Sequence, residues 1–204
     1  MNLVCGVSLG GHAAWQCLML DPRISAAISI VGCPDYISLM TDRARLTKLA
    51  TWTHSSPPGI SFLGSSDFPQ NLVEAVAKYD PAGAILGVDA ATRQALYTSE
   101  CTEVEKEHSL RAMKMHFQGK RMLDMSGRAD KLVPNRCGEG FLGWLKGISS
   151  PSGLFAGGDF MLRDLVFENV GHAMSLDMAK ELDTFIMEVL KEREQQISSK
   201  SSKI

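Results

Sequence analysis

Short apolar runs alternate with longer amphipathic stretches along this chain. Four runs are five to eight residues long and rich in apolar or β-branched residues, which predicts buried parallel strands over 1–5, 24–31, 121–126 and 162–167. Apolar residues recur at helical spacing over 11–20, 37–49, 70–78, 90–97, 102–115, 134–146 and 176–190. Strands alternating with helices in this way predict an α/β fold with a parallel sheet.

The first strand leads into a Gly-x-Ser-x-Gly stretch, Cys5-Gly6-Val7-Ser8-Leu9-Gly10-Gly11-His12, which opens a helix that Asp21-Pro22 ends. A sharp strand-to-helix turn leaves no room for a Cβ atom beside the serine, so glycine is needed on both sides of it. The first helical N–H groups point toward charge that develops next to the hydroxyl. The stretch therefore predicts a nucleophilic Ser8, and an ordinary glycine-rich turn is the alternative.

These residues resemble the nucleophile elbow of the α/β-hydrolase superfamily, and the chain is similar to its esterase and prolyl-oligopeptidase-like branches. The chain order in that superfamily is nucleophile, acid, histidine. Gly127-Arg-Ala-Asp130-Lys-Leu-Val-Pro134 resembles its acid loop, and Gly171-His172-Ala resembles its histidine loop. The resemblance implies a catalytic triad of Ser8, Asp130 and His172, with the backbone N–H of Leu9 as one oxyanion donor.

Other residues compete for the acid and base roles. Asp124 is the rival acid, but it lies nearer the middle of its strand, where an aspartate more often faces a helix or pairs structurally. Asp130 itself has an alternative role as a turn residue before Pro134. His172 competes with four histidines that lie on predicted helices or in the long central segment: His12, His54, His108 and His116.

The resemblance implies a partial α/β-hydrolase fold, a parallel sheet of about four strands flanked by helices with a helical cap insertion. We expect a core formed by 1–36 and 112–192, a crossover helix plus cap insertion in 37–111, and a polar tail in 193–204. The superfamily places several strands before the elbow, so we expect an N-terminally truncated domain. The upstream loop that supplies the second oxyanion donor is then missing, and the first strand is an open edge that allows self-association.

The segment after the second strand predicts substrate contacts. Pro34 and Tyr36 follow the carboxyl end of that strand, where ligands bind in open α/β sheets. The aromatic residues of the insertion either line an acyl or leaving-group pocket or form the insertion's own core: Trp52, Phe62, Phe68, Tyr79 and Tyr97.

Composition limits the remaining classes of function. Hydrophobic residues make up 45% and charged residues 22% of the 204 residues, a globular composition, and the formal net charge of −2 gives no basis for binding nucleic acid or an anionic membrane. No apolar run is long enough to span a bilayer. The five cysteines lack Cys-x-x-Cys spacing, which predicts reduced thiols and a cytoplasmic location: Cys5, Cys17, Cys33, Cys101 and Cys137. We expect Cys5 and Cys17 to be core residues, and we expect neither a cofactor nor a metal.

The expected activity is cleavage of a carboxylic ester, thioester or amide through an acyl-enzyme on Ser8, with His172 as the base and Asp130 as its acid partner. The substrate is then a small-molecule or peptide acyl compound. Two alternatives stay open. One is a non-catalytic hydrolase-like remnant or fragment that acts in binding, and the other is an acyltransferase with the same triad.

Overall fold

A computed structural model describes residues 2–89, 93, 96–97 and 102–201. Its centre is a parallel sheet of β1 (Asn2–Val7), β2 (Ile24–Ile30), β3 (Arg121–Gly127) and β4 (Met161–Phe167), in the spatial order β1-β2-β3-β4. The register aligns Cys5 with Ile28, Ile28 with Leu123 and Leu123 with Arg163. The predicted α/β fold with a four-stranded parallel sheet is confirmed.

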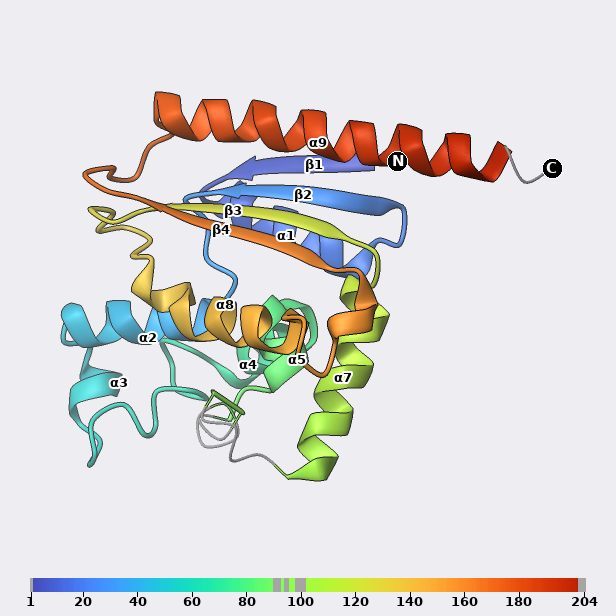
Figure 1. The fold of residues 1–204 in the computed structure, drawn as a ribbon. Helices are drawn as coiled ribbons and strands as arrows, with labels where there is room; N and C mark the ends of the chain where they lie inside the picture. Colours follow the sequence, from blue (N-terminus) through green and yellow to red (C-terminus); the bar gives the residue numbers. More distant parts are fainter. Residues whose placement is uncertain (1, 90–92, 94–95, 98–101, 202–204) are drawn as a thin grey trace.

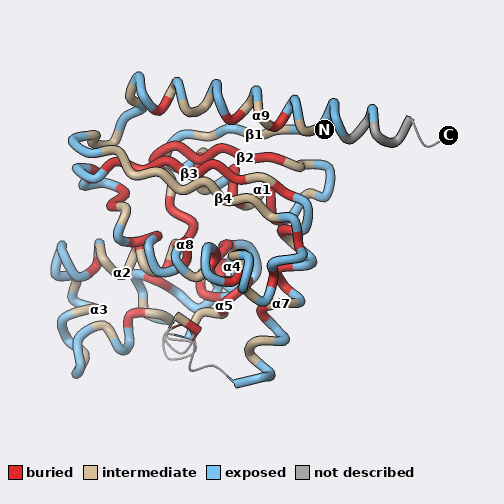
Figure 2. The backbone as a smooth tube through the Cα atoms, viewed as in Figure 1, coloured by how far each residue is buried: buried red, intermediate tan, exposed pale blue. Residues whose placement is uncertain are grey.

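Helices cover the two faces of the sheet unequally (Figure 1). α1 (Leu9–Leu20), α7 (Glu103–Phe117) and α8 (Arg136–Ser149) lie on one side, whereas α9 (Leu176–Ser201) lies across the other. α9 continues through most of the segment that the sequence predicts as a polar tail. Figure 2 shows the result for burial: β2 and β3 are mostly buried, whereas β1 and β4, at the two edges, are half-buried or exposed.

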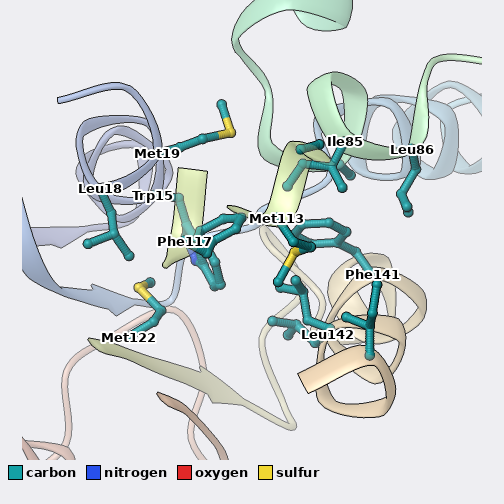
Figure 3. Close-up of a cluster of buried hydrophobic side chains, with 14 of the residues drawn as sticks. Trp15, Leu18, Met19, Ile85, Leu86, Met113, Phe117, Met122, Phe141 and Leu142 are labelled. Atoms are coloured by element: carbon teal, nitrogen blue, oxygen red, sulfur yellow. The ribbon is translucent and has the colours of Figure 1, made fainter. Parts of the chain in front are cut away.

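The larger core fills the space between the sheet and its three-helix face. Trp15 of α1 packs edge-on against Phe117 of α7 and Phe141 of α8, and Met113 lies in the same cluster (Figure 3). A second core between the sheet and α9 includes Phe185. Burying apolar area on both faces stabilises the central strands, and their carboxyl ends hold the segments described below.

The segment between β2 and β3 contains α2 (Tyr36–Leu46), α3 (Ala50–Thr53), α4 (Gln70–Tyr79), α5 (Pro81–Leu86) and α7. Phe62 and Phe68 are fully buried in a separate cluster with Trp52 at its edge, so these three aromatic residues form a core of this segment. The predicted boundary between 111 and 112 falls inside α7. The helix predicted over 90–97 lies mostly outside the described residues.

The structure corrects one expectation and adds one helix that was not expected. Cys5 and Cys17 are exposed, because β1 is the edge strand and the nearby side of α1 is uncovered, so they are not core residues. α5 is not predicted at all from the sequence. Five of its six residues are buried, so it lacks the alternation of apolar and polar positions that reveals a surface helix.

Candidate active site

Ser8 sits in a strained turn between β1 and α1. Its φ of 57° and ψ of −119° lie where residues with a Cβ atom are disfavoured. Hydrogen bonds on both sides hold this conformation: the Ser8 N–H donates to the Ile30 carbonyl at 2.8 Å, and the Ser8 carbonyl accepts from the Gly11 N–H at 2.9 Å. A Cβ atom on Gly6 would lie 1.9 Å from the Gly10 carbonyl oxygen, so only glycine fits before the serine.

A second pair of glycines brings α1 close to the end of β2. A Cβ atom on Gly11 would lie 3.1 Å from the Cα of Gly32, and one on Gly32 would lie 3.0 Å from the Cα of Gly11. This close packing fixes the first turn of α1 against the neighbouring strand. The elbow is therefore held from β1, from β2 and from its own helix.

Asp130 lies in the loop after β3 and is buried, with 4% of its surface exposed. Its Oδ1 accepts hydrogen bonds from the backbone N–H groups of Leu132 at 2.8 Å and Val133 at 2.9 Å. These two bonds orient the carboxylate and leave Oδ2 for another donor. Asp130 is thus both a turn residue and a positioned acceptor.

His172 lies in the loop after β4 and joins the other two residues. Its Nδ1 is 2.8 Å from Asp130 Oδ2, and its Nε2 is 2.8 Å from Ser8 Oγ. An ionised carboxylate oxygen only accepts, so Nδ1 carries the hydrogen and Nε2 accepts from the Ser8 hydroxyl. The two loops are also joined through the backbone, because the Ala129 N–H donates to the Val170 carbonyl at 3.0 Å. The structure therefore brings the three residues together at the carboxyl edge of the sheet.

Asp124 lies elsewhere, under α1 in the middle of β3. Its Oδ1 accepts the indole N–H of Trp15 at 2.8 Å, and Asp124 is the cross-strand partner of Asp164 on β4. Complete burial raises the pKa of Asp124 to about 7. Asp124 therefore contacts α1 and the neighbouring strand β4, and His172 contacts Asp130 instead.

Two of the four rival histidines have other partners. His116 Nδ1 is 3.1 Å from the Met19 carbonyl oxygen, which ties α7 to α1. His12 Nδ1 is 2.6 Å from the Cys33 carbonyl oxygen. His54 directly follows the short helix α3, and His108 is exposed on α7. His172 is therefore the histidine that meets Ser8.

Leu9, the predicted oxyanion donor, and Pro34 and Tyr36, the predicted substrate contacts, lie in different surroundings. Leu9 begins α1, where a helix leaves its first N–H groups without intrahelical acceptors. Pro34 is buried in packing, and its carbonyl accepts the Ala82 N–H at 3.0 Å. The Tyr36 ring is half-buried, with its centroid 5.8 Å from that of His12.

A buried polar cluster next to the site is not predicted from the sequence. Arg93 Nη1 lies 2.7 and 2.9 Å from the two carboxylate oxygens of Asp35, across 58 residues of chain. Asp80 caps α5 by accepting the Gly83 N–H at 2.8 Å and also accepts the Tyr36 N–H at 3.0 Å. The sequence gives only a local indication of these contacts. Asp35 and Asp80 each stand immediately before a helix, where N-cap residues are expected.

The described part of the chain contains no helix long and apolar enough to cross a membrane. Across the same residues, no group of three or more His, Cys, Asp or Glu side chains is arranged to hold a metal ion.

Comparison of the sequence with protein-family models and with curated proteins gives no match. Among solved structures, the chain is similar to SOBER1 from Arabidopsis thaliana, with 13% identity, a TM-score of 0.43, and coverage of 93% of this chain and 55% of that one. It is also similar to an acylaminoacyl peptidase from Pyrococcus horikoshii, with 14% identity, a TM-score of 0.43, and coverage of 93% and 23%. Acetyl xylan esterase 1 from Thermoanaerobacterium shows 16% identity, a TM-score of 0.38, and coverage of 91% and 44%.

These structures belong to the α/β-hydrolase superfamily, and the chain spans about half the length of SOBER1 and less of the other two. The chain's own parallel sheet carries a serine turn directly after β1, at the start of α1.

Proposed function

We propose that this protein is a serine hydrolase that cleaves a carboxylic ester, thioester or amide through an acyl-enzyme on Ser8. The observation that supports this is the continuous hydrogen-bonded chain from Ser8 Oγ through His172 to Asp130, with both contacts at 2.8 Å. A serine hydroxyl is a weak nucleophile until a base accepts its proton. A histidine oriented by a carboxylate supplies that base.

The proposed reaction proceeds in two halves. Ser8 Oγ attacks the carbonyl carbon while His172 Nε2 takes the hydroxyl proton, and Asp130 stabilises the resulting imidazolium. The Leu9 N–H, at the start of α1, donates to the oxyanion of the tetrahedral intermediate. His172 returns the proton to the leaving group as the C–O, C–S or C–N bond breaks. In the second half, His172 takes a proton from water as the hydroxide adds to the acyl-ester. The bond between the acyl carbon and Ser8 Oγ then breaks, His172 returns the proton to Oγ, and the acid is released.

The substrate class is a small-molecule or peptide acyl compound, and the proposed reaction uses no cofactor. The His172 side chain keeps 23% of its surface exposed, so an acyl group has access to the hydroxyl that this ring activates. A cytoplasmic location remains a prediction. The free state of Cys5, Cys17, Cys33 and Cys137 supports it.

Labelling of Ser8 tests the proposal. A fluorophosphonate probe is expected to add once to the intact chain, as measured by mass spectrometry, and Ser8→Ala should remove that adduct. Ser152→Ala changes an exposed serine outside the triad and should keep it. A folded wild-type chain that forms no adduct would overturn the proposal. Product analysis with an added alcohol or amine separates hydrolysis from acyl transfer, because transfer yields a new ester or amide.

The edge of the sheet supports a second proposal, self-association. Within the described residues, β1 pairs only with β2, and Cys5 and Val7 are exposed along it. Such an edge accepts a strand from a second copy of the chain. Sedimentation should show a dimer that Cys5→Lys dissociates, because a charge on an edge strand disfavours pairing. A wild-type monomer at high micromolar concentration would contradict this proposal.

A further inference from the structure

A cavity of about 580 Å³ lies between α7 and α8, two helices on the same side of the sheet (Figure 1). Lys106 and Ser109 line it from α7, and α8 lines it over residues 139–148. The remaining wall comes from the loop after α8 and from Leu96 and Tyr97. Its volume lies in the range of about 300–1,000 Å³ that is common for small-molecule sites. Among the described residues that line it, none belongs to the proposed catalytic triad.

The part of α8 that lines the cavity presents glycines to it. Gly140, Gly143 and Gly147 recur at spacings of three and four residues, so they lie on one face of the helix over about 10 Å. A Cβ atom on Gly143 or Gly147 would meet no atom of the described residues within 4 Å. Tight packing therefore does not explain these two glycines. Helix stability does not explain them either, because glycine disfavours a helix relative to alanine. They leave an open floor in the cavity.

The first glycine of this face shows what kind of group lies on such a floor. A Cβ atom on Gly140 would lie 3.0 Å from Cε2 and 3.1 Å from Cζ of Tyr97, so the Tyr97 ring lies directly on the bare backbone. Trp144 also lines the cavity, and its ring is stacked on that of Phe141 with 16° between the planes. The floor thus continues past Tyr97 over the other two glycines, beside a second aromatic ring. A planar ring suits this place, because aromatic rings stabilise one another in offset or edge-on contact.

Ser109 of α7 supplies a polar group without a partner. Only 1% of its surface is exposed, and its Oγ has no hydrogen-bond partner among the described residues. A serine inside a helix often donates to the carbonyl four residues earlier, but this hydroxyl does not. An unpaired buried hydroxyl destabilises the folded chain. Because Ser109 lines the cavity, a bound molecule with an oxygen atom would give this hydroxyl its missing hydrogen bond.

The charged side chains at the cavity already have partners. Lys106 Nζ lies 2.7 Å from Glu103 Oε1, and Glu139 Oε1 lies 3.4 Å from Arg128 Nη1. A charged ligand would therefore compete with ion pairs that are already formed. Its charge would also lose hydration next to the buried Ser109 hydroxyl. An uncharged oxygen is the group that fits.

We propose that the cavity between α7 and α8 binds a planar aromatic compound with one uncharged oxygen, of the phenol class. The ring lies on the open glycines beside Trp144, and the phenolic hydroxyl hydrogen-bonds to Ser109 Oγ. This site is separate from the one proposed at Ser8, and neither proposal depends on the other.

Three two-ring compounds of similar size test the two contacts: 2-naphthol, 2-methylnaphthalene and decahydro-2-naphthol. Titration of the full chain with 2-naphthol should shift the indole N–H signal of Trp144 in NMR spectra, and the loss of that signal in Trp144→Phe assigns it. 2-Naphthol should bind about three- to tenfold more tightly than 2-methylnaphthalene, because it adds one hydrogen bond. Decahydro-2-naphthol keeps the hydroxyl but has puckered rings that cannot stack, so it should bind about tenfold more weakly than 2-naphthol.

Ser109→Ala tests the hydrogen bond. It should remove the advantage of 2-naphthol over 2-methylnaphthalene and leave the affinity for 2-methylnaphthalene unchanged. Equal affinities for these two compounds in the wild type would overturn the inference. An advantage that persists in Ser109→Ala would also overturn it.

Gly143→Leu tests the floor. The new side chain fills the open face, so binding of 2-naphthol should be lost. The fold should be retained with no fall in the melting temperature, because leucine favours a helix and its Cβ atom meets no described atom within 4 Å. Gly157→Leu is the matched control. Gly157 is also exposed and equally open but lies outside the cavity, so this variant should bind as the wild type does. Unchanged binding in Gly143→Leu would overturn the inference.

Occupation of Ser8 separates this site from the proposed active site. Ser8→Ala and the fluorophosphonate-labelled chain should both bind 2-naphthol as tightly as the unlabelled wild type. Weaker binding in either would place the compound at Ser8 and overturn the assignment to this cavity. If Ser8 takes no fluorophosphonate but 2-naphthol still shifts the Trp144 signal, the hydrolase proposal fails and the cavity assignment stands.

Discussion

Asp124→Asn should stabilise this protein at neutral and alkaline pH without removing its activity. In the folded chain Asp124 is completely buried, and burial raises its pKa from 3.8 to about 7. Below pH 4 both the folded and the unfolded chain hold the proton. Between pH 4 and 7 the unfolded chain has lost it while the folded chain retains it, so the free energy of unfolding falls as pH rises.

The size of the effect follows from that shift. Three pKa units at about 1.4 kcal/mol each amount to a cost of about 4 kcal/mol, fully present above pH 7. An asparagine keeps an oxygen for the Trp15 indole N–H, which now lies 2.8 Å from Asp124 Oδ1. Its amide group can donate to Asp164, whose Oδ1 has no hydrogen-bond partner among the described residues. The substitution thus removes a buried charge and adds a donor where one is missing.

Chemical denaturation at pH 4.5 and pH 8 measures this prediction. The difference in the free energy of unfolding between Asp124→Asn and the wild type should be small at pH 4.5 and grow toward about 4 kcal/mol at pH 8. A difference that does not change with pH would refute the reasoning. Activity toward a 4-nitrophenyl ester should persist, whereas a loss near 10⁴-fold would make Asp124 the acid in place of Asp130.

Three further predictions concern the elbow, the acid and the buried ion pair. Asp130→Asn should lower kcat by about 10⁴-fold with little change in thermal stability, because it disturbs the tautomer of His172 more than the fold. An unchanged kcat would exclude Asp130 as the acid partner of His172. Gly6→Ala should cost about 3 kcal/mol or more and abolish fluorophosphonate labelling, because its Cβ atom would lie 1.9 Å from the Gly10 carbonyl oxygen. Gly10→Ala, whose Cβ atom meets nothing within 4 Å, is the matched control, and equal melting temperatures for the two variants would contradict the clash. Arg93→Met should cost about 3–5 kcal/mol in urea denaturation, since it leaves Asp35 buried without its counter-charge; a loss below about 1 kcal/mol would contradict this.

The sheet and the meeting of the three loop residues are predictable from the sequence for the same reason. Each strand is a short apolar run, and parallel strands place their carboxyl ends at one edge. Ser8, Asp130 and His172 each follow such a run, so strand positions alone bring their loops to that edge. Their catalytic roles stay a proposal that the labelling and turnover experiments decide.

The segment between β2 and β3 is less predictable because its contacts are distant in sequence and its helices are buried. Nothing near Arg93 indicates that its guanidinium pairs with Asp35, and nothing near His12 indicates that the Asp80 carboxylate lies 3.8 Å from its ring. Pro34 illustrates the opposite case. Its position after a strand predicts a substrate contact. The structure shows that it is buried, with its carbonyl accepting the Ala82 N–H, and the substrate contact stays a prediction.

The contact between Ser8 and His172 closes a loop of 164 residues in a chain of 204. Contacts between such distant residues form only after the intervening chain has been ordered, and their loop-closure entropy makes them slow to form. Serine reactivity should therefore appear last during refolding, after helical circular dichroism has recovered. Labelling of the serine in a stopped-flow experiment would therefore report that the whole sheet has formed. Local unfolding of either chain end would remove the reactivity of the serine before the rest of the chain unfolds.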